Sequence, residues 1–393
     1  MRALLPLSAD PVTFGHLALI REARARFDEM VVALLDNDMK TGRYLFSTHE
    51  RVQLLSNAVT RLGRDNVRVI VAPGILLADV FLREGCDVIV RGMRSEAEGE
   101  TEREQSRLHE LVLSGIGKRF QYIPTTDALR DVSSTSVKAF VSHGIDVSRF
   151  VPLQTKQALE ERILGQYTVG VTGPIASGKS FVGARLATRL PTLGVPCAHV
   201  SYDAILRDLY AERTPGADRL RDEIVARLGA EVRGADGLID RTAMSAKLFH
   251  PDCPMETRRA IEGLTAPHVF RLERERLAGF RGIVLIECAT LVEMGLAGRV
   301  NNHVVVVDSP ERPSMLAERG IDPARTSEVA RHQSTSDELV STLEARVTSD
   351  GNGSVTRYVN RRRTAIGASD GDILVLANAI LDLFPSIPRE VTP

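Results

Sequence analysis

Short apolar runs recur along the chain, and the stretches between them carry the mixed polar and apolar pattern of amphipathic helices. Six such runs stand out, at 30–35, 67–72, 87–92, 167–173, 283–287 and 303–308. Strands that are apolar throughout and that alternate with helices are typical of a parallel sheet covered by helices on both faces. One intervening helix, expected within 47–63, opens with Ser47 and Glu50 at the spacing of a capping box. The pattern therefore predicts an α/β fold.

The 393 residues divide at a polar, helix-forming segment, 154–166, that stands directly before a fresh apolar strand. We interpret this segment as a linker helix between a first domain, 1–153, and a second domain, 167–393, each long enough for its own core. The two domains share no visible repeat. Near the end of the second domain, 372–384 predicts a last amphipathic helix.

Composition narrows the class of protein. The 50 basic and 51 acidic side chains nearly cancel, which gives no electrostatic reason to expect a nucleic acid or a membrane as partner. The apolar runs stay below the ~18 residues of a membrane span, and the N-terminal segment lacks the pattern of a secretory signal. Cysteines without a C-x-x-C pair indicate reduced, buried thiols at Cys86, Cys197, Cys253 and Cys288. We therefore expect a cytoplasmic protein with small-molecule substrates.

The second domain contains a phosphate-binding loop. The sequence GPIASGKS, from Gly173 to Ser180, matches G-x-x-x-x-G-K-[ST], follows an apolar strand and opens a helix. This context argues against an ordinary glycine-rich turn. Lys179 is expected to reach the β- and γ-phosphates, and the Ser180 hydroxyl is expected to hold Mg²⁺. The predicted ATP-binding residues of this loop are Gly173, Ala176, Ser177, Gly178, Lys179, Ser180 and Phe181.

An aspartate, Asp203, follows the next apolar strand of the second domain. It is placed either to accept a proton from an attacking hydroxyl or simply to cap the following helix. Over residues 167–360, the phosphate loop, Asp203 and the segment 236–249 (DGLIDRTAMSAKLF) resemble the dephospho-coenzyme A kinase family. The resemblance implies that Lys179 and Asp203 are catalytic. It also implies that substrate is bound by Asp240 and Arg241, and ATP by Arg319.

The second domain departs from that family's pattern at several positions. Ser201 replaces the first of two aspartates, and Ala266 stands where the family has a histidine before proline. The segment 288–293 lacks the family's Pro-Leu-Leu, one arginine ahead of Arg319 is missing, and the adenine-side motif appears only in shifted form at 351–354. This half is therefore either a divergent kinase or a domain that binds ATP without turnover.

The first domain opens with SADPVTFGH, residues 8–16, which resembles the (T/S)-x-D-P-x-T-x-G-H motif of phosphopantetheine adenylyltransferases. The resemblance implies that His16 donates to the α- or β-phosphate of ATP in the transition state and that Ser8 binds the attacking phosphate. Taken alone, a Gly-His pair is more often an ordinary loop. Leu7 and Ala9 depart from the glycine and phenylalanine that the family prefers.

Four further motifs of that family follow in order, so the resemblance covers residues 4–152. They are a lysine ahead of F-S-T-H-E-R, the strand-end R-G-M-R, a glutamate in E-T-E-R-E-Q and V-S-S-T-S-V-K. The resemblance implies catalytic roles for His16 and Lys40. The substrate-binding residues that it implies are Ser8, Lys40, Leu77 and Arg91. The ATP-binding residues that it implies are Ser8, His16, Arg94, Glu102, Ser133, Ser134 and Thr135.

The two implied reactions are consecutive. The first joins ATP and 4′-phosphopantetheine to give dephospho-coenzyme A and pyrophosphate, and the second phosphorylates the ribose 3′-hydroxyl of that product. The chain thus resembles a bifunctional coenzyme A synthase: a Rossmann-like nucleotidyltransferase followed by a P-loop kinase, both using ATP with Mg²⁺. Fusion would raise the local concentration of the shared intermediate. A homo-oligomer is compatible with the sequence.

Two alternatives stay open at this point. One is a nicotinamide-nucleotide adenylyltransferase fused to a ribosylnicotinamide kinase, which would have the same two folds in the same order. The other is an adenylyltransferase whose second half is a nucleotide sensor without kinase activity. An assay of both substrate pairs with ATP separates them.

Overall fold

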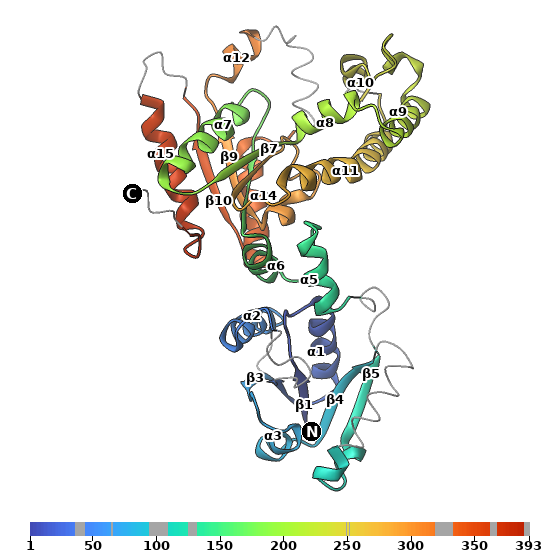
Figure 1. Ribbon diagram of the computed structural model, residues 1–393, viewed down its shortest axis with the longest axis vertical. Coiled ribbons are helices and arrows are strands. Elements are labelled where there is room, and N and C mark those ends of the chain that lie inside the picture. The colour runs from blue at the N-terminus through green and yellow to red at the C-terminus, as the bar shows by residue number, and fades with distance from the viewer. Residues whose placement is uncertain are drawn as a thin grey trace. The chain divides into compact units, whose positions relative to one another are not determined.

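The computed structural model describes residues 1–35, 44–63, 66–93, 109–124, 132–248, 250, 252–318, 333–361 and 368–388. The chain forms two compact units, Met1–Ile163 and Leu164–Pro393, each an α/β unit (Figure 1). The segment expected to be a linker is helical, as α6 (Leu153–Leu159) and a π-turn (Glu160–Leu164). Its residues up to Ile163 fall within the first compact unit, and its role as a linker stays a prediction.

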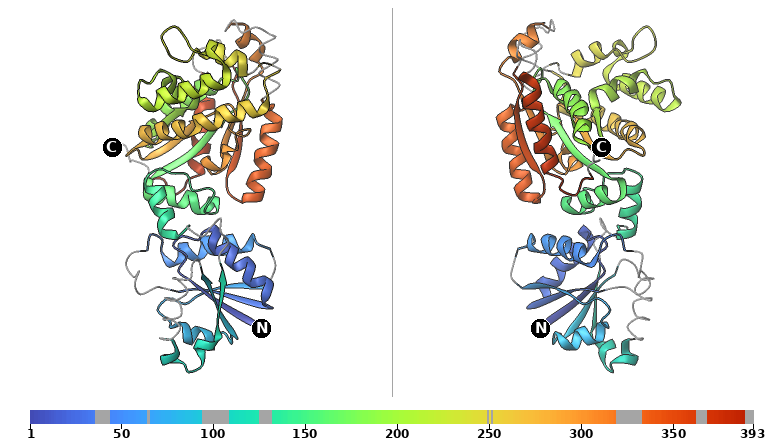
Figure 2. Two further views of the ribbon diagram at one scale, coloured as in Figure 1. Left: turned by 90° about the vertical axis from the view of Figure 1, so that its right-hand side faces the viewer. Right: turned by 60° about the vertical axis from the view of Figure 1, so that its left-hand side comes forward.

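The first unit contains a five-stranded parallel sheet with the strand order β3-β2-β1-β4-β5. Its strands are β1 (Arg2–Leu7), β2 (Glu29–Leu34), β3 (Val67–Val71), β4 (Val88–Met93) and β5 (Phe120–Pro124). Its helices include α1 (Phe14–Arg26), α2 (Thr48–Thr60), α3 (Leu77–Arg83) and α5 (Ser134–Ser142). The predicted capping box is confirmed, because the Glu50 backbone N–H donates to Ser47 Oγ and the Ser47 N–H donates to Glu50 Oε2. Helices α1 and α2 lie on one face of the sheet and α3 on the other (Figure 2).

The second unit contains another five-stranded parallel sheet, in the order β10-β9-β6-β8-β7. Its strands are β6 (Gln166–Thr172), β7 (Cys197–Ser201), β8 (Gly282–Glu287), β9 (His303–Asp308) and β10 (Ser354–Val359). Its helices include α7 (Lys179–Arg189), α8 (Tyr202–Ala211), α9 (Pro215–Leu228), α10 (Arg241–Leu248), α11 (Met255–Leu277), α12 (Arg312–Glu318), α14 (Ser336–Asp350) and α15 (Ala368–Asp382). The six predicted strands are confirmed as β2, β3 and β4 of the first unit and β6, β8 and β9 of the second, and the predicted last helix is confirmed as α15.

Strand β9 shows why the runs are apolar throughout. Val305 and Val307 face a core shared with α7 and α15, whereas Val304 and Val306 face a core shared with α8, α11 and α14. Since successive side chains of a strand point to opposite faces, a strand covered on both sides needs an apolar residue at every position.

This topology fixes where ligands can bind. The first strand of each unit, β1 or β6, lies inside its sheet, and the chain builds strands on one side of it before crossing to the other. In open parallel sheets, ligands bind beyond the carboxyl ends of the strands at such a switch point. The loops after β1 and β6, which carry the two principal motifs, therefore lie at the expected positions.

Two further properties concern the whole described chain. Its helices include none that is long and apolar enough to cross a bilayer. All four cysteines lie within the described ranges as free thiols, but only Cys86 and Cys288 are buried, so the expectation of four buried thiols is wrong for Cys197 and Cys253.

Candidate active sites

The loop after β1 leads directly into α1, and its last residue orients His16. Thr13 is the N-cap of α1, and its backbone N–H donates to His16 Nδ1 over 3.0 Å. The His16 N–H in turn lies 3.4 Å from Thr13 Oγ1. Because Nδ1 accepts a hydrogen bond, the neutral ring carries its proton on Nε2. The cap thus selects the tautomer in which Nε2 is a donor.

Asp10 anchors the same loop. Its carboxylate is 5% exposed and accepts hydrogen bonds from the backbone N–H groups of Leu45 and Phe46, both at 3.0 Å. It also forms an ion pair with Lys138 of α5, at 2.7 Å. One side chain therefore connects the β1 loop, the segment that precedes α2, and α5.

Two further contacts bring the predicted motifs of the first unit together. The buried Arg51 of α2 donates to the carbonyl oxygen of Ser8 at 3.0 Å, and its guanidinium lies 4.0 Å from the Tyr44 ring centroid. Ser134 at the start of α5 donates to the carbonyl oxygen of Pro11 at 2.8 Å. Arg51 was not among the predicted site residues, although the F-S-T-H-E-R motif ends on it.

The remaining predicted residues of the first unit lie at different places. Arg91 lies near the carboxyl end of β4, the strand beside β1. Ser133 is the N-cap of α5, with Ser134 and Thr135 in its first turn. Leu77 is 7% exposed and belongs to an apolar cluster with Leu4 and Ile89, so a contact with substrate stays a prediction. Three predicted residues lie outside the described residues: Lys40, Arg94 and Glu102.

The phosphate loop of the second unit has a backbone that only glycine permits at two points. A Cβ on Gly173, whose φ is 144°, would lie 2.1 Å from the Val307 carbonyl oxygen. A Cβ on Gly178, whose φ is 90°, would lie 2.1 Å from Asn360 Nδ2. That same Asn360 nitrogen donates to the Ser177 carbonyl oxygen at 3.1 Å, so the end of β10 supports the loop.

Polar atoms line the inside of this loop. Lys179 is buried, and its Nζ donates to the carbonyl oxygens of Gly173 and Pro174, both at 2.9 Å. Burial lowers the pKa of Lys179, and the nearby carboxylates of Glu287 and Asp203 oppose that shift. Ser177 Oγ is buried and has no hydrogen-bond partner among the described residues, as expected for a group that awaits a ligand.

Glu287, at the carboxyl end of β8, is a site residue that the sequence did not reveal. Its Oε1 accepts from Ser180 Oγ at 2.5 Å, and its Oε2 lies 3.0 Å from Nε2 of His199 on β7. Burial alone would raise the pKa of Glu287, but the hydrogen bonds from His199 and Ser180 and the charge of Lys179 outweigh burial and lower it. The carboxylate is therefore ionised at neutral pH.

Asp203 lies in the first turn of α8 and is exposed. Ser201, rather than Asp203, is the N-cap of this helix, so the capping alternative is not supported. Its neighbour Tyr202 is buried and donates to Glu273 of α11 at 2.9 Å, and the same Glu273 oxygen accepts from Arg299 at 2.7 Å. These contacts fix the start of α8, while the Asp203 side chain stays exposed to solvent.

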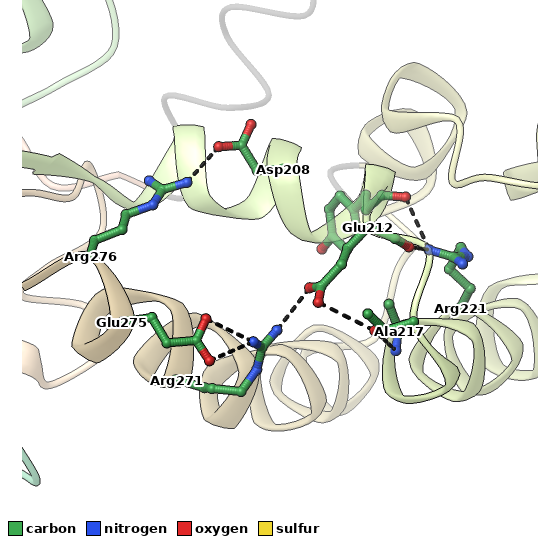
Figure 3. A network of polar contacts seen from close by, with 9 residues as sticks. Asp208, Glu212, Ala217, Arg221, Arg271, Glu275 and Arg276 are labelled. Carbon is green, nitrogen blue, oxygen red and sulfur yellow. Dashed lines mark hydrogen bonds and ion pairs between the residues drawn. The ribbon is translucent and has the colours of Figure 1, made fainter. Parts of the chain in front are cut away.

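Figure 3 shows a second group of ion pairs that holds α8 and α11 together. Arg276 pairs with Asp208 at 2.5 Å, and Arg271 bridges Glu212 at 2.8 Å and Glu275 at 2.9 Å. These ion pairs thus hold α8 against α11.

The other predicted residues of this unit have separate contacts of their own. Asp240 Oδ1 accepts from the N–H groups of Thr242 and Ala243, so it caps α10, and Arg241 is the first residue of that helix. Phe181 is exposed and lies under Arg185, whose guanidinium is 5.6 Å from the ring centroid. Arg319 lies outside the described residues.

No group of three or more His, Cys, Asp or Glu side chains that could hold a metal ion occurs in the part of the chain that the structure describes. Ser180 and Glu287 nevertheless place a hydroxyl and a carboxylate at the loop. Mg²⁺ in kinases is held by such oxygen atoms together with substrate phosphates and water, so these residues fit the ion.

Comparison with known proteins agrees with this division. Residues 167–354 match the family model of dephospho-CoA kinase, and residues 8–140 match the cytidylyltransferase-like model. The phosphopantetheine adenylyltransferase of Histophilus somni (strain 129Pt) is 36% identical over 159 residues, covering 40% of this chain and 96% of that protein. The one of Limosilactobacillus reuteri (strain DSM 20016) is 33% identical over 162 residues, covering 41% and 90%.

The fold and the family matches thus define a two-unit transferase, with a nucleotidyltransferase unit followed by a P-loop kinase unit. The chain belongs to the phosphopantetheine adenylyltransferase family through its first unit, and its second unit is a dephospho-CoA kinase domain.

Two solved structures show a weak overall likeness. One is TT1252 from Thermus thermophilus, with a TM-score of 0.41 and 24% identity, covering 55% of this chain and 97% of that chain. The other is NadR protein in complex with NR, with a TM-score of 0.30 and 14% identity, covering 100% and 98%.

Proposed function

We propose that this chain catalyses the last two steps of coenzyme A biosynthesis, one in each unit. The observation that supports the proposal is that each sheet has a motif-bearing loop at its switch point, in a chain whose two units match the two successive enzymes. In the first step, the phosphate of 4′-phosphopantetheine attacks the α-phosphorus of ATP and pyrophosphate leaves. In the second, the ribose 3′-hydroxyl of dephospho-coenzyme A attacks the γ-phosphorus of another ATP and ADP leaves.

In the first unit, we assign the chemistry to groups around the β1 loop. His16 Nε2–H donates to the ATP phosphates as charge develops on them, and Thr13 keeps the ring in the donor tautomer. Ser8 binds the attacking phosphate, and Arg51 fixes the backbone of Ser8. No covalent intermediate is needed, so the protein acts by positioning the reactants and neutralising charge.

In the second unit, Asp203 accepts the proton of the ribose hydroxyl, and Lys179 stabilises charge on the transferred phosphoryl group. Ser180 would hold Mg²⁺, with Glu287 orienting its hydroxyl, and the ion would offset negative charge on the phosphates. The assignment of Asp203 is supported by its exposure and by its effect on the pKa of Lys179.

The nicotinamide alternative is not favoured, because the relatives of the first unit are phosphopantetheine adenylyltransferases and the second unit matches the dephospho-CoA kinase family. The sensor alternative predicts ATP binding without phosphorylation of dephospho-coenzyme A. A direct assay of the kinase step decides it.

The test is a coupled assay of the full chain with 4′-phosphopantetheine and ATP, in which products are resolved by mass. Wild type should give coenzyme A. Lys179→Ala should stop at dephospho-coenzyme A, because the first unit does not use the P-loop. Arg185→Ala, on the same helix but outside the loop, is the matched control. Accumulation of dephospho-coenzyme A by wild type would favour the sensor alternative, and loss of both activities in Lys179→Ala would contradict the two-site assignment.

A further inference from the structure

His199 contacts the carboxylate of Glu287, which in turn accepts a hydrogen bond from Ser180 of the P-loop. His199 Nε2 lies 3.0 Å from Glu287 Oε2, while Glu287 Oε1 accepts from Ser180 Oγ at 2.5 Å. The side chains of Glu287 and His199 are 3% and 17% exposed, so water competes little for these bonds. An ionised carboxylate only accepts hydrogen bonds, and Nε2 of His199 is therefore the donor.

The space for this imidazole exists only because residue 183 of α7 is glycine. A Cβ on Gly183 would lie 2.4 Å from His199 Nε2 and 2.7 Å from its Cε1, closer than atoms can approach. Glycine inside a helix costs about 0.5–1 kcal/mol relative to alanine. Helix α7 therefore has glycine, a weak helix former, at residue 183, where the Cβ of an alanine would displace the His199 side chain.

The contact has a consequence for Ser180. Its hydroxyl directs its proton at Glu287, which leaves the lone pairs of Oγ to face elsewhere. A hydroxyl ligates a cation through those lone pairs. A carboxylate held at both oxygens cannot rotate, so it keeps the serine in this orientation.

We propose that His199, seated against Gly183, is a positioning residue of the kinase step that orients Glu287 so that Ser180 presents its lone pairs to the divalent cation of MgATP. The inference rests on the proposed kinase function of this unit. Residues that orient metal ligands through hydrogen bonds typically contribute ~10–100-fold to metal affinity or activity.

The first measurement is calorimetric titration of the full chain with ATP, in Mg²⁺ and in EDTA. The Lys179→Ala variant identifies the part of the isotherm that belongs to the P-loop. His199→Ala should weaken ATP binding in Mg²⁺ by ~10–100-fold and change binding in EDTA by less than about twofold. His199→Gln, which keeps an N–H donor, should restore part of the loss. Cys197→Ala, on the same strand two residues earlier, should behave as wild type.

The second measurement is a double-mutant cycle. Gly183→Ala should raise helix propensity, yet weaken metal-dependent ATP binding as His199→Ala does, because it displaces the imidazole. Since both changes remove the same contact, the double variant should be no worse than His199→Ala alone. If His199→Ala does not fold, Gly183→Ala still tests the inference.

The outcomes are distinct. Equal losses with and without Mg²⁺, a wild-type response of both single variants, or additive losses in the double variant would overturn the role of His199. Intact metal-dependent ATP binding in a chain that never phosphorylates dephospho-coenzyme A would refute the kinase function and leave the positioning role standing.

Discussion

Asp10 offers the sharpest test of how the first active site is held together. Asp10→Ala removes the acceptor of two backbone N–H groups, those of Leu45 and Phe46, and one partner of the ion pair with Lys138. A buried donor left without a partner costs about 1–3 kcal/mol. The Lys138 side chain is 27% exposed and can turn to solvent, so its pairing contributes at most about 1 kcal/mol. We expect a loss of about 3 kcal/mol in local stability.

Hydrogen–deuterium exchange is the appropriate assay, since a chain with two units does not unfold in one step. Exchange at the amides of Leu45 and Phe46 should accelerate by roughly 10²-fold in Asp10→Ala, because each 1.4 kcal/mol is a factor of ten. Lys138→Met separates the ion pair from the backbone bonds and should change exchange less than tenfold. Unchanged exchange in Asp10→Ala, or an equal effect from Lys138→Met, would refute this account of the loop.

Three other predictions concern the chemistry. His16→Ala should lower adenylyl transfer by ~10²-fold or more with the fold intact, as expected for loss of a transition-state donor; normal turnover in folded protein would return His16 to a loop role. Asp203→Asn should lower ribose phosphorylation at least ~10²-fold while ATP binding persists; normal phosphorylation would place the base elsewhere. Iodoacetamide at pH 8 should spare Cys86, Cys197 and Cys288, because burial, which is partial for Cys197, raises the pKa of their thiols to about 11, 12 and 11. Rapid labelling of these thiols in folded protein, mapped by mass, would contradict this.

The strands that the sequence predicted were those with runs rich in aliphatic residues. Strand β10 was missed, because its sequence SVTRYV mixes polar and apolar residues in an edge strand that is largely half-buried. Strand β5 lies at the other sheet's edge and was missed for the same reason. The side chains of these two edge strands are mostly only partly buried, so they do not need an aliphatic residue at every position.

The candidate sites divide in a similar way. Motifs with fixed local spacing, such as the P-loop and the β1 loop, could be predicted because one short segment contains most of the geometry. The contacts that support these loops from distant parts of the sequence could not be predicted. Glu287 meets Ser180 from 107 residues away in sequence, and Arg51 meets Ser8 from 43 residues away. Such contacts depend on strand order, which local pattern does not determine.

One departure of the kinase unit from its family's pattern is the replacement of an aspartate by Ser201, and the contacts of Glu287 and Asp203 bear on it. Ser201 lacks the carboxylate that the family carries there, so the carboxylates that act on Lys179 are those of Glu287 and Asp203. Glu287 is buried and committed to Ser180 and His199, and it cannot also accept the proton of a substrate hydroxyl. Asp203 is exposed at the start of a helix that Tyr202 fixes in place. With Glu287 engaged in the loop and Asp203 exposed, the loss at residue 201 still leaves one free carboxylate, which the proposed kinase step would use as its base.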